Sequence, residues 1–533
     1  MSPSVFDPIA AARSVVPFPR GEQGGEQPRS AKQEKQPPQA EVLRVLGQNR
    51  FRYLHHNGAP YAVPYDGPAV AVPLRAAAHT GTGSLRQHLT RIYVTEYDRT
   101  PSQTALADAV ATLDALAMRV PETELYLRVA ADPEDTAVSW LDLGRPDGES
   151  VRIAPDGWIL TCPDPEAGPV WRRTKLVRPL PRPDRPAGGW REGIGELSAL
   201  LPFTPETLPL AIGWLLAALR PGMPRPIAYL TGEQGTGKST SGQMLTGIIE
   251  GARAPLRQAP ENLRDLGPTT AAGWVLALDN LSGLPGWLSD ALCRIVTGDA
   301  QVTRALYTDD DVNVLTYQRP VLLTGIDLGA LRNDLAERMM PLELQPIHRD
   351  QRRTAGALWA AYEQAHPRIL GALLDLATEV WADLPHAAAD LTERPRLADF
   401  AELLHALDRV TGWRSLDAFN GAQDALNDAV LDGHPVAGAL RDWTASPAFP
   451  PGGWRGTMGE LHRQLSSDGR GFADGWPKTP AVLSARIRQV APALRARGIH
   501  VARTSGSNKH GKVYAVTSSS TSRWTEAFAA PRI

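Results

Sequence analysis

The chain has 533 residues, a length that predicts several domains, and its 42% hydrophobic content provides enough apolar material for packed cores. The formal net charge of −2 indicates no class of partner by itself, and two cysteines exclude a disulfide framework and cysteine-rich zinc modules. Without a membrane-length apolar run or a signal-peptide pattern, the sequence predicts a cytoplasmic protein with no membrane contact.

The N-terminal third divides into a tail and a domain. Residues 1–40 are rich in Gly, Gln, Glu and Pro, so we expect a disordered tail. Residues 41–185 mix short strand-like runs with one clear helix, for which Thr100 is the predicted cap and Pro101 the first position. This pattern predicts an accessory α+β domain, and the Pro/Arg-rich stretch 176–189 that follows predicts a linker.

Few residues of this accessory domain suggest chemistry. A primase would need a cluster of metal-binding carboxylates, and Asp142 and Asp147 come nearest, but carboxylates at this kind of strand end are more typical of turns. The pair His55 and His56 has no third ligand nearby. Trp158 and Trp171 are expected to pack in a core and not to stack on bases.

A phosphate-binding loop follows the apolar run 226–230. The pattern G-x-x-x-x-G-K-[ST] lies between a predicted strand and a predicted helix, where glycines allow backbone N–H groups to cradle phosphates. Lys238 is expected to reach the β- and γ-phosphates and Ser239 to bind Mg²⁺, so the predicted cofactors are ATP and Mg²⁺. The predicted nucleotide-binding residues are Gly232, Glu233, Gln234, Gly235, Thr236, Gly237, Lys238, Ser239 and Thr240.

A second apolar run, residues 274–278, ends in Asp279, about 40 residues beyond the loop lysine. At this distance from a phosphate-binding loop, Asp279 is the predicted metal-side acid. The next residue is Asn280, whose amide can orient water but cannot take its proton. Either Asn280 only positions the attacking water, or a carboxylate elsewhere acts as the base, with Asp290 and Asp299 as candidates.

The motifs that follow resemble a known family. A TGD…R stretch (297–304), an apolar strand ending at Thr324 and the run Asp334-Leu-Ala-Glu-Arg338 resemble the helicase core of phage, plasmid and poxvirus-type primase–helicases, a superfamily-3-like branch of the AAA+ ATPases. The resemblance covers roughly residues 190–350. It implies an α/β P-loop core over 190–345, a homo-hexamer with ATP between subunits, and Arg338 as an arginine that reaches the neighbour's ATP.

Two positions in this segment leave alternatives open. The family's sensor position usually holds Asn, and Thr324 can still bind a γ-phosphate or water through its hydroxyl. Arg338 could instead form a helix-surface salt bridge with Asp334. In the expected β-hairpin region, the resemblance implies DNA contacts by Arg304, Tyr307 and Arg319, but three consecutive aspartates, 309–311, would repel phosphates, and the alternative is a solvated turn.

The C-terminal region is basic. After a helical region at 346–443 and a Pro/Gly-rich boundary at 444–453, residues 452–517 carry eleven basic and three acidic side chains. This +8 segment alternates helical and strand-like runs, with Thr479 capping a helix, and its pattern predicts a winged-helix nucleic-acid-binding domain. A winged helix used for protein contact is the alternative. The predicted phosphate contacts are Arg486, Arg488, Lys509 and Lys512.

Two functional hypotheses follow from these patterns. The first is an ATP-dependent DNA helicase or translocase of a phage or mobile-element replication system, acting on single-stranded or forked DNA with a separate primase. The second is a DNA-binding ATPase switch, such as an initiator, loader or defence regulator, that unwinds nothing. Asn280 and Thr324 favour the switch, and the TGD…R segment favours the helicase.

Overall fold

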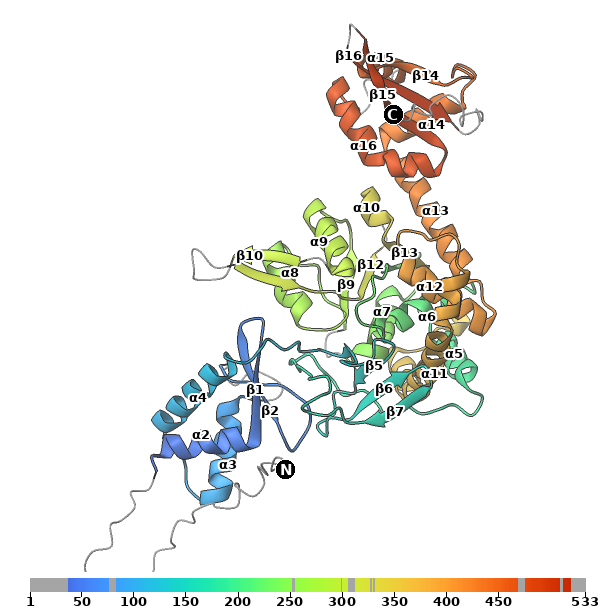
Figure 1. Cartoon of the computed structure of the whole chain (residues 1–533). Helices are drawn as coiled ribbons and strands as arrows, with labels where there is room; N and C mark the ends of the chain where they lie inside the picture. Colours follow the sequence, from blue (N-terminus) through green and yellow to red (C-terminus); the bar gives the residue numbers. More distant parts are fainter. Residues whose placement is uncertain are drawn as a thin grey trace, which may run out of the picture.

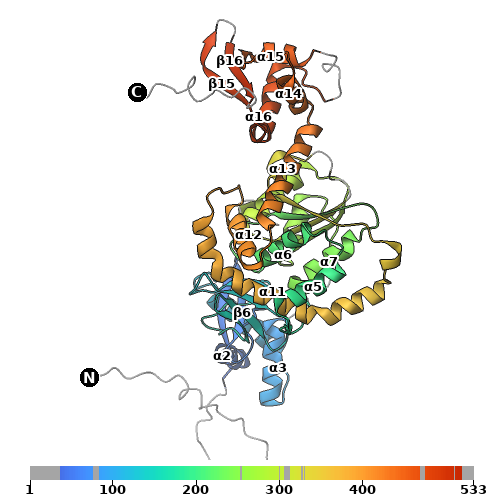
Figure 2. The same cartoon turned by 90° about the vertical axis from the view of Figure 1, so that its right-hand side faces the viewer.

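The computed structural model describes the chain in segments, and its units follow one another along a single long axis (Figure 1). An N-terminal unit and a C-terminal unit lie at opposite ends of a central body (Figures 1 and 2). The residues described are 37–75, 83–251, 255–298, 300–304, 312–325, 328, 331–467, 475–508 and 511–518. The tail predicted for residues 1–40 lies almost wholly outside these segments.

The N-terminal unit packs three helices against a small antiparallel sheet in the order β1–β2–β3. Its predicted helix begins two residues later than expected, because the Ser102 hydroxyl, and not Thr100, accepts the Ala105 N–H at 3.1 Å. The elements are α2 (Gln39–Arg50), β1 (Phe51–His56), β2 (Ala59–Pro64), β3 (Val72–Pro73), α3 (Leu85–Tyr97) and α4 (Gln103–Ala117).

A second antiparallel sheet follows, but it packs on the central body. Leu141 and Val151 belong to the same buried cluster as Trp214 of the body, so region 41–185 has no single core of its own. The predicted packing role of Trp158 and Trp171 is confirmed, because both are buried. The strands, in sheet order, are β4 (Val129–Ala131), β5 (Ser139–Asp142), β6 (Ser150–Ala154) and β7 (Gly157–Thr161).

The carboxylates considered for priming do not converge on a metal site. Asp142 is fully buried and pairs with Arg173 at 2.7 Å, whereas the exposed Asp147 pairs with Arg145 at 3.3 Å. Among the described residues, no group of three or more His, Cys, Asp or Glu side chains is placed to hold a metal ion. Each carboxylate therefore has a local structural partner.

The expected linker is packed against the body. Asp184 N–H donates to the Pro367 carbonyl of α11 (Ala355–Asp390) at 2.9 Å. A Cβ on Gly371 would lie 1.9 Å from the Asp184 carbonyl oxygen, so only glycine lets the linker approach this helix. Leu180 is buried as well. Figure 2 shows α11 curving around the base of the central body.

The centre of the molecule is a four-stranded parallel sheet in the order β13–β8–β12–β9. Side chains alternate along each strand, so one face packs on α6 and α7 and the other on α8 and α9. The strands are β8 (Ile227–Thr231), β9 (Leu276–Leu281), β12 (Val321–Gly325) and β13 (Met339–Glu343), and the helices between them are α7 (Lys238–Glu250), α8 (Leu263–Ala271), α9 (Gly286–Thr297) and α10 (Asn333–Ala336).

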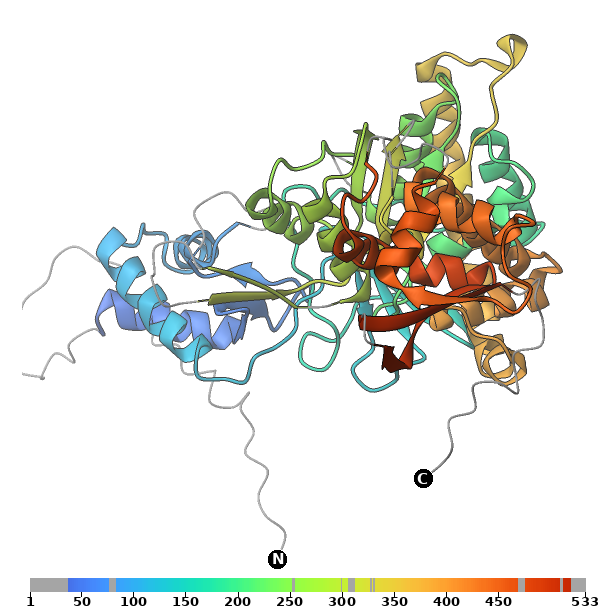
Figure 3. The same cartoon turned by 90° about the horizontal axis from the view of Figure 1, so that it is seen from above.

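A two-stranded hairpin leaves this sheet between α9 and β12, on the side of the N-terminal unit (Figures 1 and 3). It consists of β10 (Ala300–Arg304) and β11 (Val312–Thr316). Further helices complete the body and lead to the C-terminal unit: α5 (Trp190–Leu200), α6 (Thr207–Ala218), the 3-10 turn Arg349–Gln351, α12 (Ala398–Thr411) and α13 (Ser415–Gly433).

The C-terminal unit combines three helices with an antiparallel sheet in the order β14–β16–β15. Thr479 caps α16 as predicted, accepting the Val482 N–H at 3.3 Å. The unit starts before the expected residue 452, because Val436 and Leu440 of α14 share its buried cluster. Its elements are α14 (Pro435–Ala445), β14 (Trp454–Thr457), α15 (Met458–Leu465), α16 (Pro480–Ala496), β15 (Ile499–Asn508) and β16 (Gly511–Ser518).

Candidate nucleotide-binding site

The predicted phosphate-binding loop joins the carboxyl end of β8 to the first residue of α7. Gly232, Gly235 and Gly237 have φ values of 142°, 86° and 79°, which other residues rarely adopt. A Cβ on Gly232 would lie 2.9 Å from the Leu344 carbonyl oxygen, so the loop also needs glycine for space. These features give the loop a backbone cradle at a helix N-terminus, which suits a phosphate group.

The two side chains that open α7 face the loop and the neighbouring strand. Lys238 Nζ donates to the carbonyl oxygens of Gly232 and Glu233 at 2.9 and 2.8 Å, so the ammonium lies across the loop. The Ser239 hydroxyl donates to Asp279 Oδ1 at 2.9 Å. The two residues predicted for the metal thus meet directly, and their hydroxyl and carboxylate oxygens are ligands of the type that Mg²⁺ prefers.

Thr324 completes this cluster because β12 lies between β8 and β9. Its hydroxyl donates a short hydrogen bond to Asp279 Oδ1 and accepts the Asn280 N–H at 3.0 Å. The predicted sensor residue therefore orients the acid and the residue after it. Sequence spacing alone did not indicate this contact, which follows from the order of the strands.

Asn280 occupies an exposed, left-handed position at the edge of the cluster, with φ 55°. A cavity of about 460 Å³ lies beside it and Asp279. Of the two alternative bases, Asp290 forms a 2.9 Å ion pair with Arg332, and Asp299 lies outside the described residues. The Asp290 carboxylate is therefore already paired with an arginine in this conformation.

Arg338 lies at the opposite end of the sheet from the loop. Its carbonyl accepts the N–H of Ile227, the first residue of β8, whereas the loop follows the last. Five strand residues, about 16 Å, separate the two ends. Its Nη1 donates to the main-chain carbonyl of Asp334 at 2.7 Å, so the contact is not the carboxylate salt bridge considered as the alternative.

Arg332 is a second arginine near the end of β12 that the sequence analysis did not single out. Its side chain is 53% exposed, and it pairs with Asp290 on α9. The sequence could have indicated Arg332, because it immediately precedes the short helix α10 and Arg338 lies just after that helix. Arg332 and Arg338 thus lie on either side of α10.

The predicted DNA-contacting residues are only partly described. Tyr307 and Lys509 lie outside the described residues, and for Arg304 only the backbone of β10 is described. Arg488 and Lys512 are exposed on α16 and β16. Arg486 instead donates a short hydrogen bond to the Gly475 carbonyl, which ties it to the segment that precedes its own helix α16.

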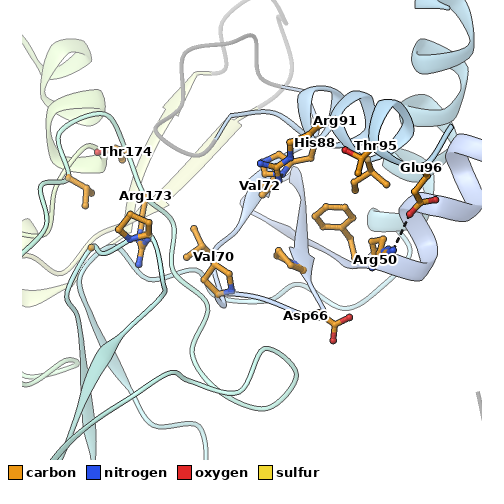
Figure 4. A pocket seen from close by; sticks show the side chains of 17 residues that line it. Arg50, Asp66, Val70, Val72, His88, Arg91, Thr95, Glu96, Arg173 and Thr174 are labelled. Atoms are coloured by element: carbon orange, nitrogen blue, oxygen red, sulfur yellow. Dashed lines mark hydrogen bonds and ion pairs between the residues drawn. The ribbon is translucent and has the colours of Figure 1, made fainter. Parts of the chain in front are cut away.

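A separate cavity of about 730 Å³ lies between α3 and two loops (Figure 4). One loop follows β5 and contributes Gly144 and Pro146, and the other follows Trp171 and contributes Arg173 and Thr174. Two of the three arginines that line it are paired with carboxylates, Arg50 with Glu96 at 3.0 Å and Arg173 with Asp142 at 2.7 Å. The third, Arg91, contacts the His88 ring nitrogen at 3.5 Å. The cavity is remote from the phosphate-binding loop.

Two family models match the chain. Residues 194–429 match the replication protein of actinomycete integrative conjugative elements, and residues 436–527 match the C-terminal domain of that replication protein, named AICE RepA. The boundary between the two matches falls at the start of α14, where the buried cluster of the C-terminal unit also begins. No curated protein matches the sequence.

Several solved structures show a distant overall likeness. An active helicase, SCCmec type IV Cch, is 12% identical with a TM-score of 0.41, covering 87% of this chain and 91% of its own. The NrS-1 C-terminal region is 10% identical with a TM-score of 0.36, over 91% and 100% of the two chains. The JCV helicase is 14% identical over 45% and 64%, with a TM-score of 0.23. At these TM-scores, the likeness assigns no function.

No helix among the described residues is long and apolar enough to cross a membrane.

Proposed function

We propose that the chain is an ATP-driven DNA helicase or translocase that serves the replication of a mobile genetic element. The observation that carries this proposal is the cluster of Ser239, Asp279 and Thr324, which is joined by hydrogen bonds beside a glycine loop with its lysine. The match of residues 194–429 to a replication protein supports the biological setting. ATP and Mg²⁺ are the cofactors that these oxygens, the ammonium and the loop suit.

Each residue has a distinct part in the proposed hydrolysis. Lys238 would exchange its two carbonyl acceptors for β- and γ-phosphate oxygens, and Ser239 and Asp279 would hold Mg²⁺, which neutralises developing charge on the phosphates. Thr324 would keep the Asp279 carboxylate aimed at the metal. Asn280 would orient the attacking water from its exposed position beside the cavity.

Assembly into a ring, the homo-hexamer that the sequence suggests, is part of this proposal. Arg338 lies about 16 Å from the loop of its own chain, across the length of β8, so it can serve only the ATP of another subunit. One guanidinium nitrogen, Nη1, already donates to the Asp334 carbonyl, so a contact with a neighbour's ATP would use the other N–H groups of Arg338.

The C-terminal unit would provide DNA binding. Its order of elements, helix–strand–helix–helix–strand–strand with β16 central, supports the proposal of a winged helix. Arg488 and Lys512 are exposed there, in the +8 segment of the sequence. Priming would fall to a separate enzyme, because Asp142 and Asp147 are engaged in ion pairs.

A DNA-binding ATPase switch is the second candidate, and Asn280 favours it. An amide accepts no proton, and Asp290 is paired with Arg332, so slow turnover would follow. Steady-state ATP hydrolysis with and without single-stranded DNA, beside unwinding of a forked duplex, tests both. DNA-stimulated hydrolysis with unwinding supports the motor, hydrolysis without unwinding or translocation supports the switch, and a wild-type chain that neither binds nor hydrolyses ATP contradicts both.

A further inference from the structure

A cavity of about 480 Å³ lies where the N-terminal unit meets the amino end of the central sheet, and we call it the root pocket because the hairpin β10–β11 starts and ends there. Residues far apart in the sequence line it. The side chains that matter are Tyr61, Tyr126, Arg172, Trp274, Tyr317 and Arg319. The volume is within the range of small-molecule sites and suits one nucleotide.

Guanidinium groups are concentrated at this pocket, and their hydrogen-bonding capacity is not filled. Arg172 Nη2 donates to the Ala271 carbonyl at 2.7 Å and Arg319 Nη1 to the Gln318 carbonyl at 3.1 Å, but the buried Nε of each has no partner. Arg225, fully buried nearby, likewise has an unpartnered Nη1. Burial lowers the pKa of Arg319 to about 10, and repulsion by Arg172 adds to the effect.

The nearby carboxylates do not balance these cations. Glu250 is buried and accepts the N–H groups of Trp274 and Val275 at 3.0 and 3.2 Å. Glu124, which lines the pocket, accepts the Tyr126 hydroxyl at 3.3 Å. Buried donors without acceptors are rare in folded proteins, and they are usually satisfied by an ordered water or a bound ion.

Aromatic rings lie beside the cations. The Arg319 guanidinium is 5.4 Å from the Trp274 ring centre and 5.2 Å from that of Tyr317. Tyr61, on β2 of the N-terminal unit, also lines the pocket and is half-buried. Guanidinium groups together with tyrosine rings are the combination that binds single-stranded nucleic acid, through phosphates and stacked bases.

We propose that the root pocket binds one nucleotide of a single nucleic-acid strand, with its phosphate on Arg172 and Arg319 and its base against Tyr61 or Tyr317. This site deepens the proposed function and rests on it, because the strand would be the one on which the motor acts. The larger cavity in Figure 4 offers the contrast, since its Arg50 and Arg173 are already paired with carboxylates.

The position of the root pocket connects it to the nucleotide site. Trp274 lies five residues before Asp279 along β9, and Arg319 lies five residues before Thr324 along β12. An occupant would therefore touch the segments from which β9 and β12 begin, about 16 Å from the ends that carry Asp279 and Thr324.

Binding of fluorescent oligothymidylate to the full-length chain, measured by anisotropy without ATP, tests the site. The Arg488→Gln/Lys512→Gln background weakens competing contacts of the C-terminal unit. In it, Arg172→Gln and Tyr61→Leu should each lower affinity about 5- to 100-fold, the range that stacking of one base supplies. Arg91→Gln, in the cavity of Figure 4, and the exposed Tyr65→Leu are the matched controls and should change affinity less than twofold.

Photo-crosslinking then locates the contact. Oligonucleotides with 5-iododeoxyuridine should give adducts on Tyr61 or Tyr317, and an abasic oligonucleotide of the same length should bind more weakly and lose sensitivity to Tyr61→Leu.

Unchanged affinity in both pocket variants, or adducts confined to the C-terminal unit, would overturn the proposal. Inorganic phosphate that competes as well as the oligonucleotide at equal phosphate concentration would also overturn it, because the site would then be for a free anion. ATP hydrolysis by the wild-type chain is measured separately, so failure of the motor and failure of the pocket are distinguishable.

Discussion

The two ends of the central parallel sheet present opposite chemistries. The carboxyl end carries Lys238 at the loop and the oxygen cluster of Asp279 and Thr324, which is partly exposed to a cavity. The amino end carries arginines, Arg319 before β12 and Arg338 before β13, and part of their guanidinium groups is buried without a partner. The same strands therefore separate the site proposed for a metal-bound nucleotide from a surface rich in cations.

In the two proposals, one small sheet serves a different ligand at each end. Loops at the carboxyl ends of parallel strands converge, which is why nucleotide sites form there. The amino ends are usually structural, but here Arg172 and Tyr61 from outside the sheet cover them and enclose the root pocket. Substitutions at each end of the sheet test whether the two ends have separate functions.

The largest effect is expected at the carboxyl end. Lys238→Ala should reduce ATP hydrolysis below detection, because it removes the only cation that lies across the phosphate-binding loop among the described residues. Steady-state phosphate release measures the change. DNA binding without ATP should stay within about twofold of wild type, since the C-terminal unit and root pocket are untouched. A variant that hydrolyses ATP at the wild-type rate would refute the assignment of the loop.

The sequence was sufficient to predict the carboxyl end, because its parts are contiguous or regularly spaced. Gly232–Ser239 is one motif, and Asp279 follows an apolar strand at a typical distance. The contact of Thr324 with Asp279 was not predictable, because it depends on β12 lying between β8 and β9. The sequence contains the residues of that contact, but not the order of the strands.

Of the amino end, the sequence indicated only Arg319, as a possible DNA contact. The pocket itself was not predictable, because Tyr61, Arg172 and Arg319 are more than 100 residues apart and no local pattern joins them. The C-terminal unit shows a different error: the Pro/Gly-rich stretch 444–453 suggested a domain boundary, yet it is a loop between α14 and β14 inside one core.

The next largest effect is expected for Arg338→Ala, which should retain ATP binding but lose about 10³-fold or more in hydrolysis if the arginine acts on a neighbour's ATP. Arg332→Ala is the matched comparison, because its side chain is exposed and pairs with Asp290. If Arg332 is the residue that acts between subunits, Arg332→Ala will lose hydrolysis and Arg338→Ala will retain it.

Mixing the Arg338→Ala and Lys238→Ala proteins tests action between subunits. Some interfaces in a mixed ring would pair an intact loop with an intact arginine, so partial activity should return. Mass photometry must first show mixed oligomers. Absence of rescue from demonstrably mixed oligomers would make Arg338 a structural residue of the amino end.

A smaller effect is expected at Thr324, which holds the Asp279 carboxylate through its hydroxyl. Thr324→Val keeps the shape but removes the donor, and hydrolysis should fall about 10-fold, because a misplaced ligand weakens Mg²⁺ binding more than nucleotide binding. Thr324→Ser, which keeps the hydroxyl, should retain most of the activity. Excess Mg²⁺ should partly rescue the valine variant, and equal rates for valine and wild type at all Mg²⁺ concentrations would contradict the role.

The smallest effect is expected in the C-terminal unit, where DNA binding is assigned to exposed charges and not to a built pocket. Each phosphate contact contributes slightly less than one unit to the slope of log affinity against log salt. Arg488→Gln/Lys512→Gln should therefore reduce that slope by about two and weaken binding about equally for all sequences. Arg497→Gln is the control, because Arg497 is already paired with Asp428 on α13 and should leave the slope unchanged.

The root pocket variant Tyr61→Leu should instead lower affinity without changing the slope, since stacking releases no counterions. A salt slope that responds to Tyr61 and not to Arg488 and Lys512 would reverse the division of work between the two regions.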